Sequence, residues 1–145
     1  MSEHRATTQW QRSGEFRYES YSRAHSLDFD GISVPGNAAP GNIPPTVDSR
    51  PGVDPEQAFV AALSSCHMLW FLHLACRKNW VVERYVDEAV GVLDQTWISR
   101  VTLRPKVTFA GPRPSDEAHR ALHHAAHERC FIANSVKTEV LVEPC

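Results

Sequence analysis

The longest apolar stretch of the chain covers residues 58–75, and it is apolar around nearly the whole circumference of a helix instead of along one stripe. A helix start lies just before it: Asp54 can cap the first turn, Pro55 suits the first helical position, and Gln57 can complete a capping box. The pattern therefore predicts a central helix over residues 55–78 that needs burial on all sides.

The central helix approaches the length of a membrane span. The polar side chains of Ser64, Ser65, His67 and His73 would be costly inside a bilayer. We therefore predict a buried core helix and no association with a membrane. One sheet covers only one side of such a helix, and 145 residues leave little chain for the other side. We expect a second copy to cover it, in an obligate homodimer.

The segments on either side of the central helix are predicted to be mostly strands. The predicted elements are N-terminal strands over 6–34 with a hairpin turn at Ser13-Gly14, a loop over 35–53 rich in proline and glycine, strands over 85–109 with a turn at 94–96, a second helix over 115–129 capped by Ser115, and a C-terminal strand over 138–143. Because strands and helices do not alternate regularly, the order predicts one α+β domain over 1–145.

Composition and charge narrow the classes of function. Fifteen lysines and arginines against 17 acidic residues give a net charge of -2, without a basic run that could follow a phosphate backbone. Nucleic acid is therefore not an expected partner. The first ten residues are polar and lack the apolar core of a signal peptide. The expected location is the cytoplasm, where thiols stay reduced.

The four cysteines contain no C-x-x-C pair and are too few for a disulfide scaffold. Cys66 and Cys76 lie ten residues apart on the predicted helix, about 15 Å along its axis, which is beyond disulfide reach. Only Cys130 or Cys145 could pair with Cys66 within the chain. Cys66 could equally be an inert core thiol, but the polar run from Ser64 to His67 requires polar partners inside the fold.

The capped segment Asp54-Pro-Glu-Gln-Ala-Phe59, the run Ser64-Ser-Cys66 and the later Cys130-x-x-x-Asn134-Ser135 resemble the OsmC/Ohr family. This resemblance implies an OsmC-like fold, with antiparallel sheets wrapped around a long buried central helix in an intertwined homodimer. It also implies a thiol-dependent peroxidase that reduces organic hydroperoxides to alcohols, and we expect no cofactor and no metal.

The same resemblance assigns roles to single residues. Cys66 corresponds to the peroxidatic cysteine, Cys130 to the resolving cysteine, and Glu56 to the acidic residue that holds a catalytic arginine. Arg23 is the first candidate for that arginine and Arg50 the alternative. Peroxide would convert Cys66 to a sulfenic acid, Cys130 would condense with it to a disulfide, and an external dithiol would reduce the disulfide.

Glu56 lies ten residues before Cys66, about 15 Å away along one helix. The two side chains of one chain can hardly share a site, so we expect an active site composed across the dimer interface. His67 stands where the resemblance leads us to expect an apolar aromatic residue, which predicts a more polar pocket.

Two other functions remain open at this point. A non-catalytic dimer could hold a small hydrophobic ligand in an apolar pocket near Cys66. Alternatively, His119, His123 and His127 repeat at helical spacing ahead of Cys130, and histidine and cysteine side chains are candidate ligands of a metal site.

Overall fold

A computed structural model describes residues 1–47 and 49–145, and Asp48, within the predicted loop 35–53, lies outside the described residues. The described chain forms two compact units, residues 1–58 and residues 59–145. Strands and helices occur in mixed order, so the predicted α+β class is confirmed.

The first unit contains one antiparallel sheet in the order β1-β2-β3, formed by β1 (Thr7–Gln9), β2 (His25–Phe29) and β3 (Ile32–Gly36). The tight hairpin turn lies at Asp30-Gly31, where both residues have positive φ, 45° and 93°. Such a turn matches the twist of its strands. The predicted turn at Ser13-Gly14 is wrong, because β1 and β2 pair only after a longer excursion of the chain.

The predicted loop 35–53 is tied to the end of β3 at its base. Val53 donates its N–H to the Pro35 carbonyl at 2.8 Å. The buried Asn37 donates its backbone N–H to the Val53 carbonyl at 3.1 Å and its side-chain N–H to the Arg50 carbonyl at 2.7 Å. A short 3-10 turn, η1 (Pro40–Asn42), lies within the loop.

Helix α1 (Pro55–Arg77) ends one residue earlier than predicted. Asp54 Oδ1 accepts the Gln57 N–H at 2.7 Å, and Gln57 Oε1 accepts the Asp54 N–H at 3.2 Å. The two residues satisfy each other's free donors, so the predicted capping box is confirmed.

Only one face of α1 is buried within the chain. Its fully buried residues recur every four positions: Leu63, His67, Phe71 and Ala75. The single chain thus covers one side of α1, as expected for one copy, and burial of the other side remains a prediction that depends on a second copy. By length and composition α1 is also able to cross a membrane, and 22% of its most apolar stretch is buried. Its buried stripe nevertheless packs on the second unit as a core helix does.

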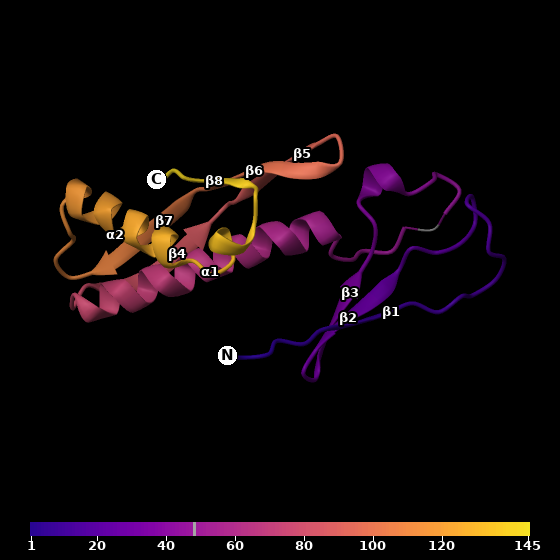
Figure 1. The fold of residues 1–145 in the computed structure, drawn as a ribbon, viewed down its shortest axis with the longest axis horizontal. Coiled ribbons are helices and arrows are strands. Elements are labelled where there is room, and N and C mark those ends of the chain that lie inside the picture. Colours follow the sequence, from indigo (N-terminus) through magenta and orange to yellow (C-terminus); the bar gives the residue numbers. More distant parts are fainter. Residues whose placement is uncertain (48) are drawn as a thin grey trace. The chain divides into compact units, whose positions relative to one another are not determined.

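The second unit joins most of α1 to two small sheets and a second helix. The strands are β4 (Val81–Asp87), β5 (Val90–Asp94), β6 (Trp97–Leu103), β7 (Pro105–Ala110) and β8 (Glu139–Val142). β4 pairs antiparallel with β7, while β6 lies between antiparallel β5 and parallel β8 (Figure 1). The predicted turn at 94–96 joins β5 to β6, but each of the two predicted strand runs is broken into two strands.

Asp87 stabilises these strand breaks. Its Oδ1 accepts the backbone N–H of Arg104, between β6 and β7, at 2.6 Å. Its Oδ2 accepts the hydroxyl of Ser64 on α1 at 2.5 Å. One carboxylate therefore satisfies a backbone donor left free by the break and one of the polar groups of the central helix.

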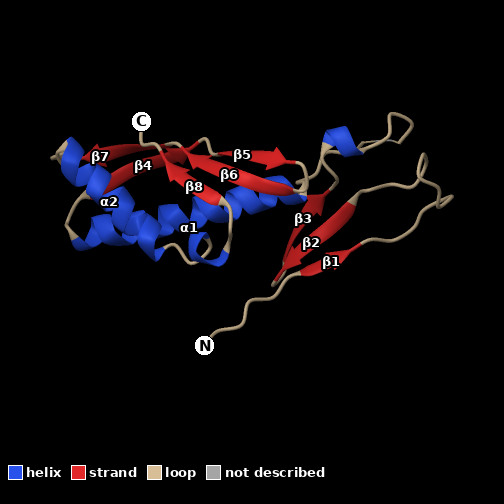
Figure 2. Cartoon of the chain, turned by 45° about the horizontal axis from the view of Figure 1, so that its top comes forward, coloured by secondary structure: helices blue, strands red, loops and turns tan. Residues whose placement is uncertain are grey.

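Helix α2 (Asp116–Arg129) begins after Ser115, whose hydroxyl accepts the Ala118 N–H at 3.2 Å as the cap predicts. Both helices pack beside the strands (Figure 2). One core cluster joins Phe71 and Ala75 to Leu122 and Ala126 of α2. The other joins α1 to β6 through the buried Leu63, Val101 and Leu103, and partly buried Val140 and Val142 of β8 pack against it.

Gly91 marks the closest approach of β5 to α1. A Cβ atom at this position would lie 2.5 Å from Val60 Cγ2, which is closer than side-chain carbons approach one another. A larger residue here would require the Val60 side chain, the helix or the strand to move.

Candidate functional site

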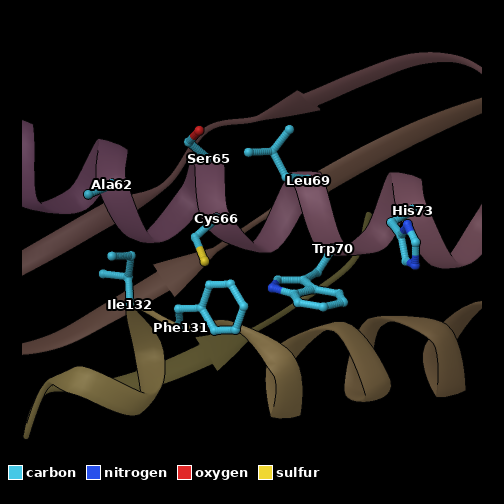
Figure 3. Close-up of a pocket in the computed structure, with 8 residues that line it drawn as sticks. All are labelled: Ala62, Ser65, Cys66, Leu69, Trp70, His73, Phe131 and Ile132. Atoms are coloured by element: carbon cyan, nitrogen blue, oxygen red, sulfur yellow. The ribbon is translucent and has the colours of Figure 1, made fainter. Parts of the chain in front are cut away.

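A pocket of about 530 Å³ opens beside the middle of α1 in the second unit (Figure 3). Cys66 points from α1 towards the segment that follows α2, where Phe131 and Ile132 face it. Most of the other lining side chains are apolar, and all of them come from α1: Ala62, Ser65, Leu69, Trp70 and His73.

The two predicted redox cysteines are neighbours, and Cys66 lines the pocket. Cys130 caps the end of α2, is 1% exposed, and accepts the Ala133 N–H at its Sγ at 3.4 Å. Burial, followed by a hydrogen bond with the Cys66 thiol, raises the pKa of Cys130 to about 11. Both cysteines are free thiols. The structure therefore brings together the sulfur atoms that a disulfide would join.

The other two cysteines are exposed and do not line the pocket. Cys76 lies near the end of α1, ten residues beyond Cys66. Cys145 is the last residue, and its backbone N–H donates to the Pro105 carbonyl at 3.0 Å. Neither residue lies in the candidate site.

Aromatic rings form one wall of the pocket. Trp70 meets Phe131 edge to face, with ring centroids 5.4 Å apart, and meets His73 in the same way at 5.7 Å. Phe131 and Leu69 leave an apolar rim, because they are 68% and 60% exposed. The helical spacing of Trp70 and His73 from Cys66 was a signal for this wall, whereas Phe131 is marked only by its place after Cys130.

The predicted polar contribution of His67 to the pocket is wrong. Adjacent side chains on a helix diverge by about 100°, and His67 is fully buried on another face of α1. Its Nε2 lies 3.0 Å from His123 Nδ1, inside the α1–α2 packing. The pocket keeps a mainly apolar lining, with Ser65 and His73 as its polar members.

The two candidate arginines lie in the first unit. Arg23 donates to the carbonyls of Tyr21 at 2.5 Å and Tyr18 at 2.8 Å, and its guanidinium lies 3.5 Å from the Tyr21 ring centroid. Arg50 is exposed in the loop, and its carbonyl accepts the Asn37 side chain. Both arginines make these contacts with residues of the first unit.

Glu56 is the second residue of α1, and its side chain is half-buried. Its Oε2 atom is buried without a hydrogen-bond partner among the described residues. A buried carboxylate oxygen is costly without a partner. The Glu56 carboxylate is therefore placed to form an ion pair with a cation from outside its own helix.

The histidines of α2 bond to each other and to α1. His123 Nε2 lies 3.2 Å from His119 Nε2, and His123 Nδ1 faces His67. Burial, followed by repulsion from His127, lowers the pKa of His67 to about 4. Over residues 1–47 and 49–145, no group of three or more histidine, cysteine or acidic side chains is arranged to hold a metal ion. The alternative of a histidine and cysteine metal site is therefore not supported.

Comparison with known proteins places the chain in a structural context. The sequence model for "OsmC-like protein" matches residues 47–144. A solved structure of VCA0330 from Vibrio cholerae, an OsmC-like protein of unknown function, is 46% identical, with a TM-score of 0.93 over 100% of both chains. A search of curated proteins finds no match.

More distant structures share the fold alone. The organic hydroperoxide resistance protein OhrB of Bacillus subtilis is 20% identical, with a TM-score of 0.69 over 99% of this chain and 98% of its own. An organic hydroperoxide resistance protein OsmC from Legionella pneumophila is 18% identical, with a TM-score of 0.68 over 99% and 96%. The OsmC-like fold predicted from the motifs is confirmed.

Proposed function

Because the chain belongs to the OsmC-like protein family, we propose that it is a thiol-dependent peroxidase that reduces organic hydroperoxides to alcohols. The observation that carries this proposal is the Cys66 thiol in a mainly apolar pocket with the Cys130 thiol beside it. An apolar pocket favours the hydrocarbon part of an organic hydroperoxide over water-like peroxides.

The proposed cycle uses both thiols in turn. The Cys66 thiolate attacks the terminal peroxide oxygen, the O–O bond breaks, and the alkoxide takes a proton and leaves as the alcohol. Cys66 is left as a sulfenic acid. The Cys130 sulfur then attacks the Cys66 sulfur, forming the S–S bond while the hydroxyl leaves with the Cys130 proton as water. An external dithiol restores both thiols by exchange.

A buried thiolate needs a cation nearby, because desolvation alone makes it unreactive. We propose Arg23 for this role, with Arg50 as the alternative, and Glu56 as the carboxylate that holds the arginine. The unpartnered Glu56 Oε2 supports this assignment. Since Glu56 lies about 15 Å from Cys66 along one helix, the proposal places these groups in a site shared between two copies of the chain.

The proposed assembly is a homodimer packed through α1. A stripe of α1 opposite the core remains exposed in the single chain: Ala61, Ala62, Ser65, Leu69 and His73. Small and apolar side chains on one helix face permit close approach of a second helix and gain free energy by burial. The proposed location is the cytoplasm, where free cysteines persist and dithiol reductants act.

Ala61→Arg is expected to convert the dimer into monomers, because it places a charged side chain on the exposed α1 face. Sedimentation velocity at one protein concentration measures the change in mass. Ala121→Arg is the matched control, since Ala121 is also an exposed alanine but lies on α2, and this variant should stay dimeric. A monomeric wild-type protein, or a dimeric Ala61→Arg variant, contradicts the proposed interface.

A second candidate function follows from the same pocket. Its volume of about 530 Å³ lies within the range of small-molecule sites. A non-catalytic protein with this pocket would retain a small hydrophobic ligand without oxidising Cys66.

Mass spectrometry separates the two functions. Cumene hydroperoxide added without reductant is expected to link the Cys66 and Cys130 peptides and to leave Cys76 and Cys145 as thiols. Cumyl alcohol, which lacks the O–O bond, is the matched control and should link nothing. Unoxidised Cys66 after hydroperoxide treatment overturns the peroxidase. Saturable retention of cumyl alcohol in that case supports the binding protein.

A further inference from the structure

Three buried imidazoles form a continuous chain between α1 and α2. His67 Nε2 and His123 Nδ1 are 3.0 Å apart, and their rings are parallel within 5°. His123 Nε2 and His119 Nε2 are 3.2 Å apart. The Phe71 ring stacks on His123 with centroids 4.2 Å apart and holds the middle ring in place. Neither the peroxide chemistry nor the pocket uses this chain.

The hydrogen bonds restrict where protons can sit. Each contact between two ring nitrogens needs one hydrogen, donated from either side. Three neutral imidazoles carry three hydrogens, so two occupy the contacts and one remains for an outer nitrogen. That nitrogen is either His119 Nδ1 or His67 Nδ1.

The two outer nitrogens differ in their surroundings. His67 is 0% exposed, and its Nδ1 is buried without a hydrogen-bond partner among the described residues. His119 lies nearer the surface, with 6% exposed. An orphaned buried N–H is rarer than an under-used acceptor. The third hydrogen therefore belongs on His119 Nδ1, and His67 Nδ1 carries a bare lone pair.

A fourth proton has one place to go while both hydrogen bonds last. With one hydrogen in each contact and one on His119 Nδ1, the added hydrogen occupies His67 Nδ1. This holds whichever ring carries the charge, because the bonded hydrogens shift between neighbouring nitrogens. A positive charge at the outer ring, His119, thus changes the buried end of the chain from acceptor to donor.

We propose that His119, His123 and His67 form a proton relay that couples protonation of His119 near the surface to the hydrogen on the buried Nδ1 atom of His67. The step moves protons alone: the added proton takes the free lone pair of His67 Nδ1, and each bonded hydrogen shifts by one nitrogen towards His119, which then carries the positive charge. The relay ends on α1 beside Cys66, yet it does not depend on the proposed peroxidase activity.

The charged and titratable groups around the chain come from each element packed on it. His119 faces Arg113 in the loop before α2, together with Asp116 and Arg120 on α2. His67 faces His127 on α2. From β4, Tyr85 packs on Phe71 with ring centroids 5.6 Å apart. From β7, the apolar ring of Phe109 meets His119 at 5.7 Å. Burial is the first cause that lowers the pKa of His119.

Long-range ¹H–¹⁵N correlation spectra of histidine-labelled protein test the relay, because they report which ring nitrogen carries hydrogen. At pH 7 we expect hydrogen on Nε2 of His67 and His123 and on Nδ1 of His119. On acidification, His67 Nδ1 should gain hydrogen at the same midpoint as the titration of His119. His123→Leu should remove this common midpoint, while His124→Gln, an exposed neighbour on α2, should preserve it.

Three results would each overturn the relay. The first is hydrogen on His67 Nδ1 in the wild-type protein at pH 7. The second is a His67 midpoint that differs from that of His119. The third is loss of the folded spectrum before His119 titrates, since a proton that enters only on unfolding is not relayed. The wild-type spectra decide the matter even where His123→Leu does not fold.

Discussion

Cys66→Ser is expected to lower the rate of organic hydroperoxide consumption by roughly 10³-fold or more, since the variant lacks the nucleophile on which the proposed cycle begins. A serine hydroxyl is not ionised at neutral pH, and no other group of the pocket is a thiol. The measurement is cumene hydroperoxide loss under steady-state conditions with dithiothreitol as the dithiol.

Three further variants make this result specific. Cys130→Ser should retain one turnover and accumulate the Cys66 sulfenic acid, which a dimedone adduct detects by mass. Cys76→Ser and Cys145→Ser remove exposed thiols outside the pocket and should leave the rate unchanged. A wild-type rate in Cys66→Ser, or an equal loss in Cys76→Ser, contradicts the assigned nucleophile.

The free energy of unfolding is expected to fall steeply as the pH drops from about 6 to about 4. The pKa of His67 is lowered to about 4, and that of His123 to about 3, with burial as the first cause of both. An unfolded histidine titrates near pH 6.5. Below that pH the unfolded chain therefore binds protons that the folded chain does not, and acid favours unfolding.

The size of this acid effect follows from linkage. Each of the two histidines contributes at most about 1.4 kcal/mol per pH unit within that window, so the two together contribute at most about 3 kcal/mol per pH unit. A domain with a typical stability of about 5–15 kcal/mol loses much of it by pH 4. Above about pH 7 this contribution is constant, because both states then hold these rings neutral.

Urea unfolding followed by circular dichroism at a series of pH values measures the acid effect. His123→Leu should flatten the dependence, because it removes one titrating group and separates His67 from His119. His124→Gln should keep the wild-type slope, since His124 is exposed. A wild-type stability that stays level between pH 6 and pH 4 contradicts the burial of neutral imidazoles.

The parts of the fold that were predicted from the sequence depend on local chemistry. The Asp54 and Gln57 pair and the Ser115 cap define where the two helices begin, because their side chains bond to backbone groups within three residues. The predictions that were wrong concern which distant segments of the chain pair or contact each other. The hairpin turn was placed at Ser13-Gly14, although Asp30-Gly31 makes it, and the break of the long strands depends on Asp87, which contacts Ser64 and Arg104.

The candidate site shows the same division. Motif spacing singled out Cys66 and Cys130, and the structure places their thiols within hydrogen-bond reach of each other. The prediction that His67 makes the pocket polar is wrong, because its ring bonds His123 instead. Only the packing of α1 against α2 decides which neighbour a side chain in the middle of an apolar helix will meet.

The sequence by itself determined the capped central helix and the α+β class, because these depend on short-range hydrogen bonds and periodicity, and the family resemblance predicted the cysteine pair. The tertiary structure decided which face of α1 is buried, which side chains form the pocket wall beside Cys66, and that three histidines bond into one chain. These properties depend on contacts between residues far apart in sequence, such as His67 and His123. A buried polar side chain needs a hydrogen-bond partner. The sequence shows that such a side chain lies in an apolar helix, but only the packing of the two helices decides which residue becomes its partner.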